Sequence, residues 1–178
     1  MNIGIAGLGT IGGSLARAFY RTANYSVLGW DNDVYTMQRA QMIHTLDVIL
    51  IDSNIGKCKV ILFIMSPEET RDYLEKNGKF IKPDTLVIDC ALADRSVYEL
   101  GCSMARQYGF TFLAGRPLIE VAEEGFRSSR PDLFAGASML LVPENPSDEA
   151  LIAHVQTLFT SVGFAGLTLS TLEEAGIQ

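Results

Sequence analysis

Three glycines and one carboxylate near the amino terminus have the spacing of a site for a phosphate-bearing ligand. Gly7, Gly9 and Gly12 follow the apolar run that opens the chain, and a helical pattern comes directly after them. A second apolar run at 25–30 ends at Asp31. This order of strand, glycine-rich turn, helix, strand and acidic residue predicts a dinucleotide site.

Each glycine has a physical role in this interpretation. Gly7 allows the tight turn off the strand, Gly9 lets backbone approach a pyrophosphate, and Gly12 lets the helix lie close to the sheet. The helix then directs unpaired N–H groups and the positive end of its dipole at the phosphates. The predicted site also includes the residues between the glycines, Leu8, Thr10 and Ile11.

Asp31 lies 19 residues after Gly12, at the end of the predicted second strand. A carboxylate there accepts hydrogen bonds from both ribose hydroxyls of an adenosine and repels a 2′-phosphate. Asn32 follows, where a basic residue would have served that phosphate. We therefore expect NAD as cofactor, with NADP disfavoured. The alternative is that the glycines mark an ordinary turn of an α/β domain that binds no nucleotide.

The composition bounds the class of protein. A chain of 178 residues with 48% apolar and 20% charged residues suits one globular domain, and no apolar run reaches the ~18 residues of a membrane helix. The net charge of −7 argues against a nucleic-acid partner. Three cysteines without CxxC spacing and two distant histidines suggest reduced thiols and no zinc site. Because the chain enters a strand at once, we expect no leader segment and a cytoplasmic location.

Strands and helices alternate along the chain. This predicts a Rossmann-type α/β fold, with a doubly wound, mostly parallel sheet and helices on both faces. We expect a dinucleotide-binding domain at 1–170 and a short stub at 171–178. The predicted strands are 2–6, 25–30, 59–65, 85–89, 110–114, 138–142 and 165–169, and 46–51 is either a strand or a helical turn. Besides the first helix, the predicted helices are 33–42, 67–78, 95–108 and 148–161.

Local signals add detail to these elements. Ser66 is expected to cap the helix that begins at Pro67, with Glu69 completing a capping box. The strand end at Ser66 and Pro67 is also where a nicotinamide ribose would lie, although the cap alone explains Ser66. We expect Asn32 or Asp31 to cap the helix at 33–42.

Three further expectations concern packing and loops. Val34, Met37 and Met42 are expected to form the buried face of the helix at 33–42. The segment 115–117 should be a sharp exit from a short strand. The segment 118–132 should form a loop with a helical turn.

The segment 115–136 resembles a loop of the prephenate and arogenate dehydrogenases. It begins Gly-Arg-Pro at 115–117, continues with Gly-Phe at 125–126 and ends Asp-Leu-Phe-Ala-Gly at 132–136. In that family the loop begins Gly-His-Pro and continues to Gly-Phe and Asp-Leu-Phe-x-Gly with the same spacing. The segment 7–15 also resembles the glycine motif of the family, so the resemblance covers almost the whole chain.

The resemblance implies an activity and a cofactor. In the family, prephenate loses carbon dioxide as hydride passes to NAD(P), which produces 4-hydroxyphenylpyruvate for tyrosine and thus aromatic amino acid biosynthesis. A histidine of the Gly-His-Pro segment takes the proton of the ring hydroxyl, and a serine of an Asp-x-Gly-Ser segment assists it. A helical domain after the Rossmann domain forms the dimer and supplies basic residues to the substrate.

This chain departs from the family at each of these points. Arg116 occupies the histidine position, and a guanidinium stays protonated near neutral pH. Counting from Asp89, the serine position falls at Leu92, and Asp94 replaces the following lysine. The helical domain lies outside these 178 residues. General acid–base help contributes about 10²–10⁴ to a rate, so we expect little prephenate oxidation.

Three hypotheses follow. The first is a prephenate-dehydrogenase-like oxidoreductase whose substrate lies between Ser66, the segment 89–94 and Arg116. The second is a catalytically silent dinucleotide-binding or regulatory module. The third is a β-hydroxyacid or imine reductase. Such an enzyme needs a lysine or an acidic residue facing the nicotinamide, and this chain has no evident candidate. Arg116 would bind a small carboxylate or phosphate, or would only pair with acidic neighbours. Those neighbours are Glu120, Glu123 and Glu124. Without the helical domain we expect at most a weak homodimer.

Overall fold

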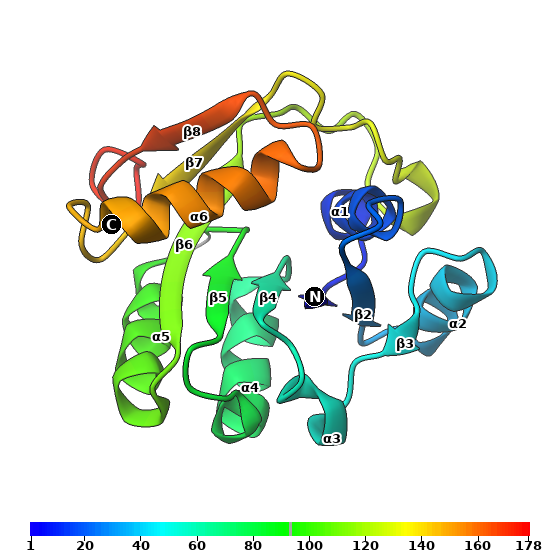
Figure 1. Cartoon of the computed structure of the whole chain (residues 1–178), viewed down its shortest axis with the longest axis horizontal. Coiled ribbons are helices and arrows are strands. Elements are labelled where there is room, and N and C mark those ends of the chain that lie inside the picture. Colours follow the sequence, from blue (N-terminus) through cyan, green and yellow to red (C-terminus); the bar gives the residue numbers. More distant parts are fainter. Residues whose placement is uncertain (93) are drawn as a thin grey trace.

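The computed structural model describes residues 1–92 and 94–178, which contain one eight-stranded sheet (Figure 1). The strand order is β3-β2-β1-β4-β5-β6-β7-β8, and only the β6–β7 pair is antiparallel. The bounds are β1 (Asn2–Ala6), β2 (Ser26–Trp30), β3 (Val48–Ile49), β4 (Val60–Phe63), β5 (Leu86–Asp89), β6 (Thr111–Pro117), β7 (Ser138–Val142) and β8 (Gly166–Leu169). The predicted doubly wound fold is confirmed.

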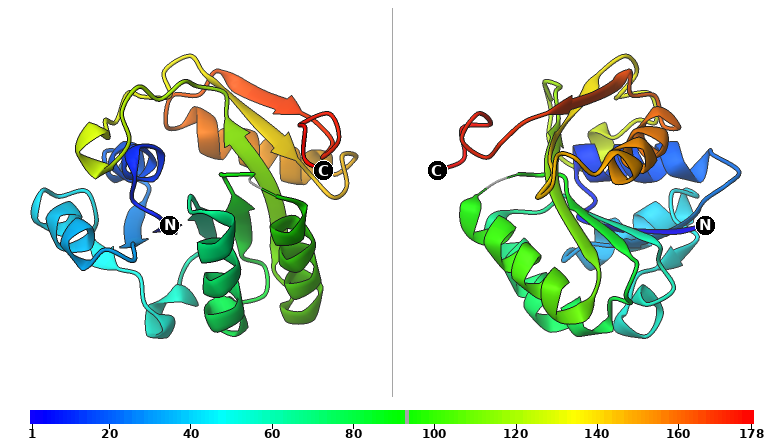
Figure 2. Two further views of the ribbon diagram at one scale, coloured as in Figure 1. Left: turned by 180° about the vertical axis from the view of Figure 1, so that it is seen from behind. Right: turned by 60° about the vertical axis from the view of Figure 1, so that its left-hand side comes forward.

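Helices cover both faces of the sheet. Figure 2 shows α4 and α5 on one side of the sheet and α1 and α6 on the other. The α-helices are α1 (Thr10–Tyr20), α2 (Val34–Met42), α3 (Asp52–Ile55), α4 (Pro67–Asn77), α5 (Arg95–Tyr108) and α6 (Glu149–Thr160). Two short 3₁₀ helices are η1 (Gly78–Phe80) and η2 (Phe126–Ser128).

The central strands are buried on both faces, as their continuous apolar sequence predicts. In β4, Leu62 packs into the cluster that includes α1 and α6, whereas its neighbour Ile61 packs into the cluster that includes α4 and α5. Adjacent residues of a strand point to opposite faces, so both layers are anchored on the same four residues.

The glycine-rich turn leaves the sheet where the order of the strands reverses. From β1 the chain proceeds through α1, β2 and α2 to β3 on one side, and β4 then pairs with the other side of β1. Loops that leave the carboxyl ends of β1 and β4 therefore diverge, and ligands of doubly wound folds bind in the crevice between such loops.

The long connection between β6 and β7 packs against α1. The backbone N–H of Arg130 donates to Ser14 Oγ at 2.9 Å, and Arg17 Nε donates to Ser129 Oγ at 2.8 Å. A Cβ on Gly13 would lie 2.8 Å from the Phe126 ring. The predicted loop with a helical turn is confirmed as η2, and Gly13 is required for its close approach to α1.

Helix α2 differs from the prediction in its cap and in its buried face. Asp33 is the N-cap and accepts from the backbone N–H of Tyr35, whereas Asn32 and Asp31 were expected. Of the three residues predicted for the buried face, Met37 packs against the core, whereas Val34 is 55% exposed and Met42 is 79% exposed. Ala40 is the fully buried residue of this helix. The reason is that α2 lies beside the two-residue edge strand β3, which offers little surface to cover.

Strand β6 is longer than predicted. It continues through Arg116 and Pro117, which lie opposite Leu140 and Met139 of the antiparallel strand β7. The expected sharp exit at 115–117 is therefore wrong, because β7 pairs with this stretch and holds it extended. The ambiguous segment 46–51 contains β3, and the short helix α3 was not predicted.

The carboxyl-terminal segment 171–178 packs against the sheet. Ala175 lies in a cluster with Leu92, Ala114 and Leu140, and Leu172 and Ile177 pack against this cluster. Within residues 1–92 and 94–178, no helix combines the length and the apolar character that a membrane span needs.

Candidate functional site

Two of the three motif glycines are required by the backbone packing itself. Gly7 has φ of +95°, and a Cβ there would lie 2.0 Å from the carbonyl oxygen of Ile64. A Cβ on Gly12 would lie 1.8 Å from the carbonyl oxygen of Gly7. These contacts bring α1 directly onto the turn after β1, and they agree with the roles predicted for both residues.

Gly9 is different, because no protein atom lies within 4 Å of where its Cβ would be. Its φ of −73° is open to any residue. Packing and backbone conformation therefore give no reason for a glycine here. The space beside Gly9 suits a group that approaches the backbone from outside.

The amino terminus of α1 has no side-chain cap. Gly9 is its N-cap, and no acidic residue lies in the first turn. By contrast, α2, α4, α5 and α6 are capped by side chains, from Asp33, Ser66, Asp94 and Asp148. The first N–H groups of any helix lack partners within it, so α1 presents unpaired donors and a positive dipole end at the turn.

The Asp31 carboxylate lies against the glycine-rich turn. Its Oδ2 accepts from the backbone N–H of Leu8 at 2.7 Å, and its Oδ1 accepts from Asp33 at 2.9 Å. The N–H of Leu8 is thus already bonded within the protein, and the Leu8 side chain is fully buried. Leu8 therefore stabilises the turn through its buried side chain and its bond to Asp31. This structural role was not part of the prediction, which placed Leu8 among the residues that contact the cofactor.

The capping box predicted at α4 is confirmed, and it extends further than expected. Ser66 Oγ accepts from the backbone N–H of Glu69 at 3.3 Å, and Glu69 Oε2 accepts from the backbone N–H of Ser66 at 3.1 Å. The other carboxylate oxygen, Oε1, accepts from Asn32 Nδ2. Glu69 therefore links the loop after β4 to the loop after β2, across the end of β1.

Two cavities adjoin Glu69. One, of about 500 Å³, is lined by the motif residues Gly9, Thr10 and Ile11, by Ser66 and by Glu124. The other, of about 560 Å³, is lined by Trp30, Asn32 and Tyr73 among others. Glu69 lines both cavities. The only charged side chains that the structure describes in the lining of the first cavity are Glu69 and Glu124.

The excursion after β6 reaches the glycine-rich turn. The Thr10 hydroxyl donates toward two carbonyl oxygens, that of Glu123 at 2.8 Å and that of Gly125 at 3.0 Å. Val121, Glu124 and Gly125 line the cavity at the turn. The sequence placed these residues in a loop but offered no signal that the loop would meet Thr10.

Arg116 and Leu92 lie in different environments. Arg116 is exposed on β6, and the ion pairs among the described residues do not include it, so pairing with Glu120, Glu123 or Glu124 is absent from this part of the chain. It does not line the cavity at the glycine-rich turn. Leu92 is 2% exposed and packs in the apolar cluster under the carboxyl-terminal segment.

The neighbourhood of Asp89 bears on the predicted substrate region. Asp89 is buried at the end of β5, where it accepts from the backbone N–H of Ala91 at 3.0 Å. Burial raises the pKa of Asp89 to about 6. Asp94 caps α5 by accepting from Val97, which explains an acidic residue at this position. Ala93, also within the segment predicted to face substrate, lies outside the described residues.

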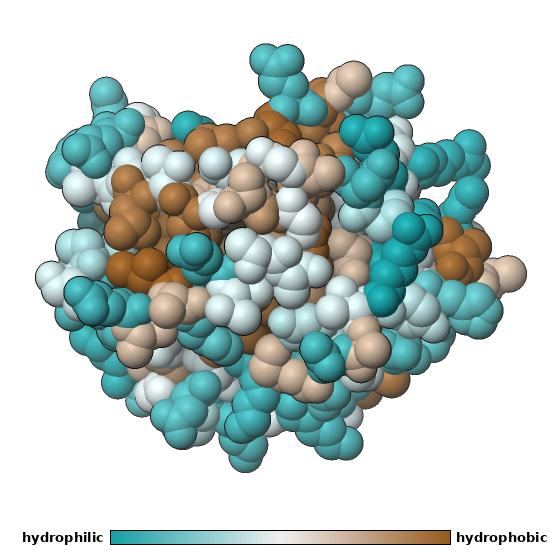
Figure 3. All heavy atoms as spheres, turned by 45° about the horizontal axis from the view of Figure 1, so that its top comes forward, coloured by the Kyte–Doolittle hydropathy of each residue, from teal (hydrophilic) through white to brown (hydrophobic). Residues whose placement is uncertain are grey.

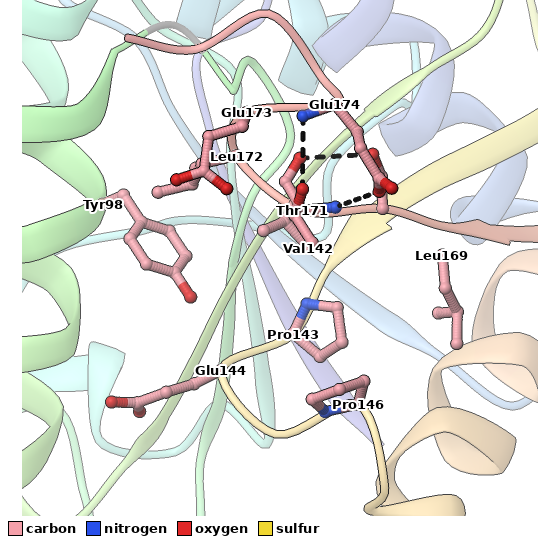
Figure 4. A pocket seen from close by; sticks show the side chains of 11 residues that line it. Tyr98, Val142, Pro143, Glu144, Pro146, Leu169, Thr171, Leu172, Glu173 and Glu174 are labelled. Carbon is pink, nitrogen blue, oxygen red and sulfur yellow. Dashed lines mark hydrogen bonds between the residues drawn. The ribbon is translucent and has the colours of Figure 1, made fainter.

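A further cavity of about 410 Å³ lies beside the carboxyl-terminal segment (Figure 4). Tyr98, Pro143, Glu144 and Leu172 line it, and Thr171 and Glu174 are joined there by reciprocal hydrogen bonds. None of its described lining residues belongs to the glycine-rich turn. Figure 3 shows apolar patches between polar side chains on the upper face of the molecule.

Fold and turn together define a Rossmann-type nucleotide-binding domain. The chain belongs to the prephenate dehydrogenase family, since the sequence model of the family's nucleotide-binding domain matches residues 15–165. The match begins after the glycine-rich turn, so the turn itself lies outside the matched residues. The chain is thus a nucleotide-binding domain of the prephenate dehydrogenase family.

Solved structures show the same fold. Arogenate dehydrogenase from Synechocystis has a TM-score of 0.83 and 24% identity over 96% of this chain and 60% of that chain. Prephenate dehydrogenase from Aquifex aeolicus, in complex with hydroxyphenyl propionate and NAD+, has a TM-score of 0.82 and 19% identity over 97% of this chain and 60% of that chain. An imine reductase from Myxococcus stipitatus, in complex with NADP+, has a TM-score of 0.73 and 15% identity over 99% of this chain and 57% of that chain. This chain spans about 60% of the length of the first two.

Proposed function

We propose that this chain binds NAD, rather than NADP, at the glycine-rich turn and forms the cofactor half of a prephenate-dehydrogenase-like enzyme. The observation that carries this proposal is the uncapped amino terminus of α1 beside Gly9, where no protein atom fills the space of a Cβ. A diphosphate supplies the acceptors that such N–H groups need. If the glycines only formed an ordinary turn, the unpaired N–H donors and the empty space beside Gly9 would have no explanation.

Different residues of the chain would contact different parts of the dinucleotide. The N–H groups of Thr10 and Ile11 face the diphosphate, and the free lone pairs of Asp31 accept from the adenosine ribose. Ser66, which lines the same cavity as Ala91, and the adjacent Pro67 would stand at the nicotinamide end. A dinucleotide held in this way would supply the nicotinamide ring as the hydride acceptor. The NAD preference is supported by Asp31 and by the acidic lining of the cavity, because each carboxylate repels an additional phosphate.

For the substrate we propose a small carboxylate of the prephenate or arogenate type, and hence a place in tyrosine synthesis. Family membership supports this class. Arg116 remains protonated and cannot serve as base, but its donors are free to bind an anion. The second candidate is a catalytically silent dinucleotide-binding module. It is favoured by Leu92, a buried apolar side chain that offers no hydroxyl at the position the family uses.

We also propose a cytoplasmic location and a weak homodimer. The location is supported by Cys58, Cys90 and Cys102, which are all free and buried. For the homodimer, the support is exposed apolar side chains such as Leu118 and Leu169. Light scattering at increasing protein concentration tests the dimer, and a constant monomer mass would contradict it.

Trp30 provides a direct probe for the test. It is the only tryptophan of the chain, it lines the 560 Å³ cavity, and it immediately precedes Asp31. NADH and NADPH are titrated while tryptophan fluorescence is followed, and NAD reduction is then assayed with prephenate and arogenate. We expect NADH to bind at least tenfold more tightly than NADPH.

The matched variants are Gly9→Val and Gly166→Val. Both positions are extended or strand-like and have no protein atom within 4 Å of the new Cβ, so both variants should fold. We expect Gly9→Val alone to lose NADH affinity, by tenfold or more. The proposed site would be disproved if wild-type protein binds neither nucleotide at millimolar concentration. It would also be disproved if the two variants bind NADH with equal affinity. Binding without turnover supports the silent module.

A further inference from the structure

We propose that Glu69 is a second selectivity residue, which acts with Asp31 to exclude the 2′-phosphate of NADP. This inference rests on the proposed function, because it assumes that the dinucleotide lies over the glycine-rich turn. It assigns to Glu69 a role that its position in a helix cap does not require.

A capping box uses only part of the Glu69 side chain. The cap requires one carboxylate oxygen, which Oε2 provides to the backbone N–H and the hydroxyl of Ser66 at 3.1 Å and 2.9 Å. The second oxygen contributes nothing to this cap. It reaches instead to Asn32 Nδ2, on a different loop and 37 residues earlier in the chain.

The bond to Asn32 places the charge of Glu69 at the adenosine end of the site. Asn32 directly follows Asp31, whose carboxylate is bonded to Leu8 in the glycine-rich turn. Glu69 also lines both the cavity at that turn and the cavity beside Trp30 and Asn32. A dinucleotide that extends from Gly9 past Asp31 therefore passes next to Glu69.

Glu69 has no ion-pair partner among the described residues, and the one cation in the lining of the cavity beside Trp30 and Asn32, Lys76, is accompanied there by Asp52 and Asp72. The recorded partners of Glu69 are the uncharged groups of Ser66 and Asn32. Asn32 is an amide where a cation would have balanced the carboxylate. A doubly charged 2′-phosphate brought beside Asp31 would thus be repelled by two carboxylates, whereas the hydroxyls of NAD can donate to them.

The test compares Glu69→Gln with Glu68→Gln. Glutamine at the third helical position retains a capping box, so the helix should form. Glu68 is exposed in the same helical turn and lines neither cavity, so Glu68→Gln makes the same charge change away from the site. We expect Glu69→Gln to tighten NADPH about fivefold or more while changing NADH about twofold or less. Glu68→Gln should leave the ratio of the two dissociation constants unchanged.

A measurement on the wild-type protein serves as a second test. Salt screens exposed charges, so the ratio of the NADPH to the NADH dissociation constant should fall severalfold between about 20 and 500 mM KCl. The inference is overturned if the wild type binds NADH but Glu69→Gln and Glu68→Gln behave alike, or if the ratio is independent of salt. The inference is also overturned if the wild-type protein binds NADPH as tightly as it binds NADH. Loss of binding to both nucleotides in wild type would instead refute the proposed function.

Discussion

The Asp31 carboxylate accepts a hydrogen bond from the backbone N–H of Leu8, with 2.7 Å between Oδ2 and the nitrogen. This contact ties the end of β2 to the turn that leaves β1. The N–H of Leu8 lies in a fully buried residue. Asp31 therefore stabilises the glycine-rich turn as well as offering its remaining lone pairs to a ribose.

We predict that Asp31→Ala weakens the binding of both NADH and NADPH, with the greater loss for NADH. The variant removes the ribose acceptor and also leaves the Leu8 N–H without a partner, which costs about 1–3 kcal/mol of folding stability. Fluorescence titration of both nucleotides and urea denaturation would measure these effects. A variant that loses NADH but retains full NADPH affinity and stability would show that Asp31 does not support the turn.

Asp47→Ala is the matched control for this prediction. Asp47 Oδ2 accepts from the backbone N–H of Val27 at 2.7 Å, near the opposite end of β2. The substitution therefore removes the same kind of hydrogen bond far from the glycine-rich turn. We expect a comparable loss of stability and no change in nucleotide affinity.

We predict that Asp89→Asn makes the protein more stable near pH 7. Burial raises the pKa of Asp89 to about 6 in the folded protein, against 3.8 for the free side chain. The native state thus retains a proton that the unfolded chain releases. The resulting stabilisation is present below about pH 4 and is lost as the pH rises through 6, a change of about 3 kcal/mol.

Urea denaturation between pH 4 and pH 8 tests this prediction. The difference in unfolding free energy between variant and wild type should grow in favour of the variant as the pH rises, because asparagine still accepts from Ala91 and never ionises. Glu75→Gln, at an exposed position of α4, should show no such trend. A difference independent of pH would mean that Asp89 titrates normally in the folded protein.

We predict that Arg116→Gln leaves the fold and NADH affinity unchanged but weakens the binding of a carboxylate substrate. The side chain is exposed and the ion pairs of the described residues omit it, so its loss should shift the melting temperature by about 1 °C or less. A charge-assisted hydrogen bond to a carboxylate is worth about 1.5–3 kcal/mol, or roughly tenfold or more in affinity.

Calorimetric titration of prephenate into the NADH-saturated protein measures that affinity. Arg106→Gln is the control, because Arg106 pairs with Glu144 on the exposed side of α5 and should not affect the titration. Unchanged prephenate binding in Arg116→Gln would remove Arg116 from the substrate site. A large loss of stability would mean that Arg116 has a structural partner.

Local signals in the sequence predicted the parts of the site that neighbouring residues build. The spacing of Gly7 and Gly12 predicted a tight turn with a helix packed on it, and this packing is so close that a Cβ on Gly12 would lie 1.8 Å from the carbonyl oxygen of Gly7. Ser66 and Glu69 predicted a capping box because its partners are three residues apart. Gly109, with φ of +85°, predicted the end of α5 because few other residues adopt this conformation easily.

Contacts between distant segments could not be predicted in the same way. Nothing in the sequence near Asn32 indicates that its amide meets Glu69, and nothing near Thr10 indicates that it donates to the carbonyl of Gly125. The pairing of β6 with β7 similarly extended a strand through Arg116, where the local sequence indicated a turn.

The amino-acid sequence alone therefore determined the alternation of elements, the fold class and the bare-backbone turn, because periodicity, caps and glycine conformation act over a few residues. Only the tertiary structure decided which side chains surround that turn. Asp31, Glu69 and Glu124 come from three loops that meet only when β1, β2 and β4 pair and the long excursion closes over α1. Such meetings depend on strand order and packing, which no short stretch of sequence encodes.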